Sequence, residues 1–70
     1  MDANKLRGKI TECGMTVGEF CEKAYFNRST FDRKIHGKSD FTLGEIQKIA
    51  QILKLSEEDL RNIFFAKLVT

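Results

Sequence analysis

Residues 16–37 read TVGEFCEKAYFNRSTFDRKIHG, and the other parts of the 70-residue chain can be arranged around them. In the first half of this stretch, apolar residues recur at the spacing i, i+3, i+4 and i+7, which gathers them on one face of a helix. These residues are Val17, Phe20, Cys21 and Ala24. Thr16 is a favourable N-cap, and Glu19, three residues later, can complete a capping box. The first half therefore predicts a short amphipathic helix that begins after Thr16.

The second half predicts another helix, which follows a turn at Tyr25 and Phe26. Asn27 is a good N-cap because its side chain can accept a hydrogen bond from a free backbone N–H. Phe26 and Phe31 then stand at the two positions of a hydrophobic staple. Gly37 closes the helix. The whole stretch is therefore predicted to be a helix-turn-helix.

The second of these helices is predicted to have one apolar face and one polar face. At about 100° per residue, Phe31 and Ile35 point toward the core. The residues that point roughly the opposite way are Ser29, Arg33 and His36, with Arg28 and Asp32 on the flank. The outer face is therefore a row of hydrogen-bonding groups.

One further helix is predicted before this stretch, over about Ala3 to Cys13. Its inward positions are Ala3, Leu6, Ile10 and Cys13. Gly14 ends the helix, and Met15 can fold back onto Ile10 in the contact that accompanies a Schellman cap.

Two more helices are predicted after it. Thr42 and Glu45 form a second capping box and Phe41 with Ile46 a second staple, so the fourth helix starts at Leu43. Its apolar stripe is Leu43, Ile46, Ile49, Ala50 and Leu53. Ser56 caps the fifth helix, where the helix dipole favours the acids Glu57, Glu58 and Asp59. The stripe of the fifth helix is Leu60, Ile63, Phe64 and Leu68, and Phe65 has no place on that face.

These elements predict an all-α fold, a compact five-helix bundle that forms a single domain over residues 1–70. The segment 64–70, FFAKLVT, is rich in large apolar side chains for a chain end. Two interpretations are open: the segment caps the core, or it forms a homodimer interface through the C-terminal helix.

Composition limits the kind of protein. Hydrophobic residues make up 41% and charged residues 31% of the chain, as in a globular domain. No apolar run is long enough for a membrane span or a signal peptide, so we expect a cytoplasmic protein. Cys13 and Cys21 lack the spacing of metal ligands and are expected to be buried thiols. His36 is not accompanied by a nucleophile or a carboxylate set, so we expect no enzyme, cofactor, metal or small-molecule substrate.

The distribution of charge is more informative than the net charge of +2. Residues 1–38 contain eight Lys or Arg and five Asp or Glu, a net charge of +3, whereas residues 39–70 carry −1. The positive part coincides with the helix-turn-helix, as expected of a surface that faces phosphates. On charge alone, ordinary solvated lysines explain the pattern equally simply.

The stretch resembles the helix-turn-helix of phage Cro proteins and repressors, the Cro and repressor-like (XRE) family. The resemblance rests on core positions and on the start of the second helix. The residues concerned are Phe20, Cys21, Ala24, Phe26, Phe31 and Ile35, together with the run Asn27-Arg28-Ser29-Thr30. Two positions differ from the family. Tyr25 stands where a Gly is usual, so we expect a turn of different detail. Val17-Gly18 stands where many members of the family carry a polar side chain that touches phosphate.

The resemblance implies a transcription regulator that binds double-stranded DNA at a palindromic operator. The residues expected to read bases are Asn27, Arg28, Ser29 and Arg33, and those expected to hold phosphates are Thr16, Lys34, Lys38, Ser39 and Thr42. For Asp32, an intrahelical pair with Arg28 is favoured over cytosine readout. The alternative function is a protein-interaction module on the same fold, such as an antirepressor or an antitoxin-type partner.

Overall fold

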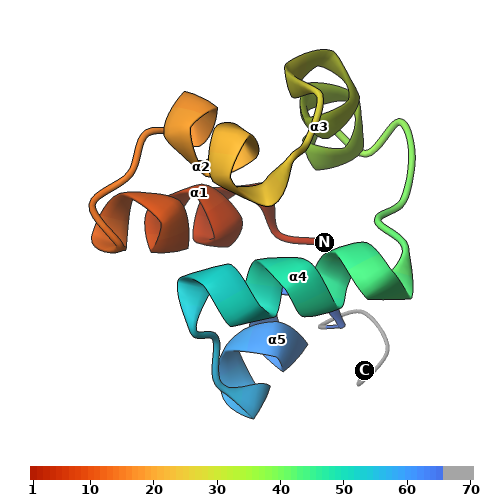
Figure 1. The fold of residues 1–70 in the computed structure, drawn as a ribbon. Helices are drawn as coiled ribbons and strands as arrows, with labels where there is room; N and C mark the ends of the chain where they lie inside the picture. The colour runs from red at the N-terminus through yellow and green to blue at the C-terminus, as the bar shows by residue number, and fades with distance from the viewer. Residues whose placement is uncertain (66–70) are drawn as a thin grey trace.

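Five α-helices occur in residues 1–65, the part of the chain that the computed structural model describes (Figure 1). They are α1 (Ala3–Glu12), α2 (Val17–Ala24), α3 (Arg28–Ile35), α4 (Leu43–Leu53) and α5 (Glu57–Phe64). Between residues 1 and 65 no strand is present. The predicted all-α fold and the predicted number of helices are confirmed.

Side-chain caps set the helix starts. In α2 the Thr16 hydroxyl accepts from the Glu19 N–H at 3.1 Å, and the Glu19 carboxylate accepts from the Thr16 N–H at 2.9 Å. The same reciprocal pair starts α4 at Thr42 and Glu45, with distances of 3.1 and 2.8 Å. At α3 the Asn27 side chain accepts from the Thr30 N–H at 3.2 Å. Each satisfied N–H is one that the first helical turn would otherwise leave free.

One apolar core joins the helices. Helix α2 contacts α1, α3 and α4, and α5 packs against α1. The buried side chains are Leu6, Ile10, Phe20, Cys21, Ala24, Phe31, Ile35, Ile49, Leu53 and Ile63. Among the described residues, no polar or charged residue belongs to this buried set. The core therefore rests on apolar packing, with polar groups confined to its border.

Two residues predicted to face the core do not. Cys13 is exposed because α1 ends at Glu12, which leaves Cys13 as the C-cap residue. Leu43 is 67% exposed. It is the first residue of α4, and a helical side chain leans toward the N-terminus, so Leu43 points past the end of the packed surface. Met15 packs against the core, as predicted, and its N–H donates to the Ile10 carbonyl at 3.2 Å.

Helix α5 closes the core at the chain's other end. Phe64 packs against the buried cluster, and the Asp2 N–H donates to the Ile63 carbonyl at 2.7 Å. An ion pair of 3.5 Å between Lys9 and Asp59 lies between α1 and α5. Phe65 is partly buried, with its ring centroid 6.4 Å from that of Phe64. Leu68, the last residue of the predicted stripe, lies outside the described residues, and the two interpretations of segment 64–70 differ there.

The turn between α2 and α3 keeps a left-handed residue although that residue is a tyrosine. Tyr25 has φ 58° and ψ 36°, so the expectation of a different turn is wrong. This geometry lets the Phe26 N–H donate to the Cys21 carbonyl at 2.9 Å, as in a Schellman cap. It also brings the Phe26 ring to 5.6 Å from that of Phe31, which is the predicted staple. Packing of Phe26 therefore outweighs the backbone strain at Tyr25.

Helix α4 holds this turn and the end of α3 in place. The Lys48 ammonium donates to the carbonyl of Ala24, the last residue of α2, at 2.8 Å, and lies 4.9 Å from the centroid of the Phe26 ring. The Lys34 ammonium donates to both carboxylate oxygens of Glu45, at 2.6 and 2.8 Å. Only 14% of the Lys34 side chain and 22% of the Glu45 side chain are exposed. Two polar contacts therefore link α4 to the helix-turn-helix.

We predict that Tyr25→Gly stabilises the fold. A left-handed residue with a Cβ is strained by about 1–2 kcal/mol, and part of that gain is offset by the freedom of Gly in the unfolded chain. Tyr25 is 91% exposed, so little packing is lost. Urea unfolding should show a gain of about 1 kcal/mol. Lys23→Gly, at an exposed position inside α2, is the control and should destabilise by about 1 kcal/mol. A lower free energy of unfolding in Tyr25→Gly than in wild type would show that the left-handed backbone at Tyr25 is not strained.

The second prediction concerns pH. Partial burial alone would raise the pKa of Glu45, but the hydrogen bonds from Lys34 and Thr42 and the Lys34 charge together hold it below its usual value. The ionised carboxylate therefore stabilises the fold at pH above the unfolded-state pKa of about 4.3, and this stabilisation is lost as the pH falls through the folded-state pKa.

Glu45→Gln removes the charge and keeps an oxygen for the Thr42 N–H. At neutral pH we expect a loss of about 1 kcal/mol in the free energy of unfolding, and the difference from wild type should shrink as the pH falls below about 4.3. Denaturant unfolding between pH 3 and 7 measures this difference. A difference that does not vary with pH would exclude the charge as its source.

Candidate nucleic-acid interface

The rotation of α3 about its own axis is fixed by the residues that it buries. Phe31 is fully buried and Ile35 is 5% exposed, one helical turn apart on the same side of α3. The Phe31 ring lies 5.7 Å from the centroids of both Phe20 and Phe41. Aromatic pairs at this spacing add to the free energy of burial. The opposite face of α3 is consequently turned to solvent.

A shallow hollow runs along this outer face. It is lined by Ser29, Asp32, Arg33, His36 and Lys38. Ser29, Arg33, His36 and Lys38 are exposed and Asp32 is half-buried. The sequence placed Ser29, Arg33 and His36 on one face of the helix, and the structure brings these three together with Lys38 from the following loop. The hollow therefore presents both hydrogen-bond donors and hydrogen-bond acceptors on the outer face of α3.

Arg28 stands at the start of α3, beside the start of α2. Its Nε donates to the Asp32 carboxylate at 3.2 Å, so the predicted intrahelical pair is present. The Nη1 atom lies 3.5 Å from the position that a Cβ would take on Gly18. Arg28 thus spans the gap between the two helices, over the first turn of α2.

The capping residues retain hydrogen-bonding capacity toward a ligand. The acceptor oxygens of Thr16, Asn27 and Thr42 are used in the caps. Each side chain nevertheless keeps a donor, a hydroxyl O–H in the threonines and an amide NH₂ in Asn27. All three residues are exposed. A phosphate oxygen or a base edge can therefore be met by these donors without breaking a cap.

Of the basic and polar residues expected to hold phosphates after α3, Lys38 and Ser39 are exposed. Lys34 has another partner, because its ammonium is bound by Glu45 and lies 5.8 Å from the centroid of the Phe41 ring. The structure therefore places Lys34 in a contact between helices, away from the exposed set. Lys34 and Glu45 lie on different helices, α3 and α4, so the periodicity within one helix does not reveal the pair.

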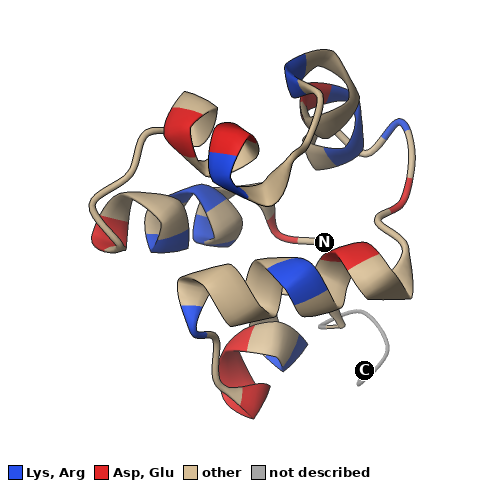
Figure 2. Cartoon of the chain, in the orientation of Figure 1, with Lys and Arg blue, Asp and Glu red and all other residues tan. Residues whose placement is uncertain are grey.

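The charges on the helix-turn-helix differ between its two helices. Figure 2 shows several Lys and Arg positions on α3 and in the loop after it, with one acid in each, whereas acidic positions predominate on α2 and at the start of α5. The acids of α2 are Glu19 and Glu22, and those at the start of α5 are Glu57, Glu58 and Asp59. The basic groups near the outer face of α3 are Arg28, Arg33 and Lys38. This positive surface is the one suited to a polyanion.

Beneath the start of α3, the thiol of Cys21 is part of the core. Burial raises the pKa of Cys21, the Arg28 charge opposes this rise, and the Asp32 charge adds to it. The thiol is therefore protonated at neutral pH, which suits a small apolar packing residue rather than a nucleophile or a metal ligand. Cys21 is thus buried as predicted, in contrast to Cys13.

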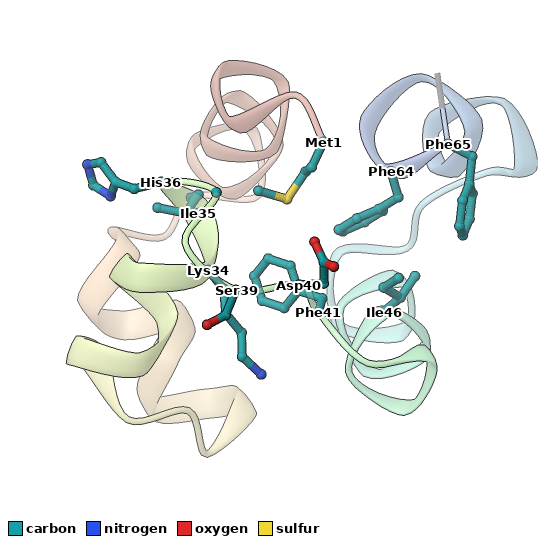
Figure 3. A pocket seen from close by; sticks show the side chains of 11 residues that line it. Met1, Lys34, Ile35, His36, Ser39, Asp40, Phe41, Ile46, Phe64 and Phe65 are labelled. Carbon is teal, nitrogen blue, oxygen red and sulfur yellow. The ribbon is translucent and has the colours of Figure 1, made fainter. Parts of the chain in front are cut away.

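A second hollow, of about 650 Å³, lies away from this face (Figure 3). It opens between the C-terminal end of α3, the loop after it, the start of α4 and the end of α5, with apolar walls from Met1, Ile35, Phe41, Ile46, Phe64 and Phe65. Figure 3 shows that the Phe41 and Phe64 side chains point into it and that His36 points away. Asp40 is its acidic residue.

Lys48 is a positioning residue that the sequence did not reveal. Its ammonium donates to the Ala24 carbonyl at the turn. No short-range signal marks it, because its partner is 24 residues away in the chain.

Within residues 1–65, none of the helices has both the length and the apolar character required to span a bilayer. The described residues also contain no cluster of three or more His, Cys, Asp or Glu side chains arranged to hold a metal ion.

Comparison with known proteins gives one match. Residues 5–64 match the family described as the Cro/C1-type HTH DNA-binding domain. Neither the curated proteins nor the solved structures include a significant match to this chain. The family match includes all of α2 and α3 and reaches the end of α5. The protein therefore belongs to the Cro/C1-type family of helix-turn-helix DNA-binding domains.

Proposed function

We propose that the protein is a sequence-specific transcription regulator, Cro-like or repressor-like and of phage or prophage origin, which acts in the cytoplasm by occupying a promoter. In this proposal α3 enters the major groove of a palindromic operator. The observation that carries it is the outer face of α3 with Ser29 and Arg33, which the burial of Phe31 and Ile35 keeps exposed, beside the exposed Lys38 of the following loop.

The contacts divide into two classes. Arg28, Ser29 and Arg33, with the amide of Asn27, read base edges. An arginine fork matches the two acceptors of guanine, so each half-site contains at least one G·C pair. Lys38, Ser39 and the hydroxyls of Thr16 and Thr42 hold phosphates, together with the free N–H groups in the first turn of α2. Lys34 acts indirectly, since its pair with Glu45 holds α3 against α4.

Two copies would bind the two halves of the operator. The homodimer is proposed to form through the C-terminal helix, where Phe64 and Phe65 line an open hollow. The same hollow favours the second candidate, a protein-interaction module such as an antirepressor or an antitoxin-type partner. Selection of bound sequences from random DNA, run with sedimentation at several concentrations, separates the two candidates. A stable protein complex without an enriched DNA sequence would favour the second.

We predict different effects for the two classes of contact. Arg33→Ala should weaken binding to the selected operator by about 1–3 kcal/mol and relax the choice of base at one position. Lys38→Ala should weaken binding to all sequences alike and reduce the slope of affinity against salt concentration by about one. Titrations of operator and scrambled duplexes at several salt concentrations measure both effects.

Lys54→Ala is the control, because it also removes one positive charge but is exposed at the C-terminal end of α4, outside both residue classes and outside the helix proposed for the dimer. It should leave operator selectivity unchanged. An Arg33→Ala variant that binds its selected operator as tightly as wild type would show that α3 does not read bases through this residue.

A further inference from the structure

Asp32 is the one acid on α3, the helix that carries the proposed base contacts. A carboxylate facing DNA is repelled by the phosphates, so its presence there calls for a compensating role. An exposed i, i+4 ion pair contributes only about 0.3–0.5 kcal/mol to stability, and the Arg28 and Asp32 side chains are 57% and 45% exposed. Stability alone is therefore a weak reason for the pair.

The geometry of the pair is more specific than its charge. The Asp32 carboxylate engages Nε of Arg28, the nitrogen nearest the aliphatic chain. The other end of the guanidinium lies over the first turn of α2, with Nη1 at 3.5 Å from the virtual Cβ of Gly18. With Nε occupied, the plane of the guanidinium is set, and the two terminal nitrogens form the fork that remains for a partner.

We infer that Asp32 is a positioning residue for DNA recognition, which holds the guanidinium of Arg28 so that its terminal fork meets a guanine. This inference rests on the proposed function. It makes the base selectivity of Arg28 depend on a second residue, Asp32. Ordering the arginine before binding lowers the entropy that is lost when it meets the base. The guanidinium lies against the start of α2, where a Cβ on Gly18 would be in van der Waals contact with Nη1.

Removing an acid from a DNA-binding face has two effects that must be separated. Less repulsion tightens binding to every sequence, whereas a released Arg28 loses discrimination among sequences. The ratio of Kd values for the operator and for an operator changed at one G·C pair cancels the first effect and retains the second. The base pair to change is the G·C pair whose replacement does not weaken DNA binding by the Arg28→Ala variant.

The test is a double-mutant cycle on this ratio, with Arg28→Ala, Asp32→Ala and the double variant. Asp32→Ala should lower the discrimination by about fivefold or more, which corresponds to the lower end of the range for one bidentate base contact. In the Arg28→Ala background the same substitution should leave the ratio unchanged. Asp32→Glu, which keeps the charge at the end of a longer chain, should restore part of it. Glu22→Ala removes one exposed acid from α2 and should not alter the ratio.

The contact itself can be measured without DNA. In the NMR spectrum of the free protein, the Nε–H resonance of Arg28 should shift and exchange faster in Asp32→Ala, while the circular dichroism spectrum stays helical. An unchanged resonance would overturn the inference.

The DNA results are equally decisive. An unchanged ratio in Asp32→Ala, with wild type still selective, would overturn the role of Asp32 and leave the proposed function intact. A loss of discrimination in Asp32→Ala at a different base pair, one where Arg28→Ala still discriminates, would assign the readout to Asp32 itself. Failure of the wild type to select any sequence would overturn the proposed function and this role with it.

Discussion

The structure depends on the burial of Phe31 against its aromatic neighbours. Phe31 touches Phe20, Phe26 and Phe41 at centroid distances of 5.6–5.7 Å and is fully buried. Truncating such a residue to Ala typically costs about 3–5 kcal/mol, a large part of the 5–15 kcal/mol that holds a small domain folded. Because Phe31 and Ile35 occupy one side of a helix of only eight residues, their burial leaves α3 a single rotational setting. The composition of its outer face follows from that constraint.

Polar contacts then define how α3 lies relative to its neighbours. Lys48 holds the carbonyl at the end of α2, and Glu45 holds Lys34 near the end of α3. Both partners come from α4, which is not part of the helix-turn-helix. The geometry of the helix-turn-helix is therefore set in part by α4. The strained backbone of Tyr25 is tolerated because these contacts and the packing of Phe26 require the turn.

Sequence reasoning was most successful where the determining interactions are local. The capping boxes at Thr16 and Thr42, and the staple of Phe26 with Phe31, depend on residues three to five apart, and the structure contains them. The helical period also placed Phe31 and Ile35 inward. Errors arose at helix ends, because Cys13 and Leu43 follow the helical period but stand at the end of α1 and the start of α4, where both residues are exposed.

The candidate site divides in the same way. The outward row on α3 could be read from the period, and the Arg28–Asp32 pair from its i, i+4 spacing. The partner of Lys34, the role of Lys48 and the left-handed turn at Tyr25 could not, since each depends on contacts between helices or on packing around the turn. Local sequence patterns thus predict which residues face outward. Contacts between helices determine which of these residues already have a partner within the protein.

Because one face of α3 is buried in the core, we expect the opposite face to contact DNA. Amide chemical-shift mapping during titration with a selected DNA duplex measures this contact. We expect shifts concentrated at Asn27 to Arg33, at the first turn of α2 and at Lys38 and Ser39, with α5 little affected. Shifts concentrated on α1 and α5, with the outer face of α3 unperturbed, would contradict it.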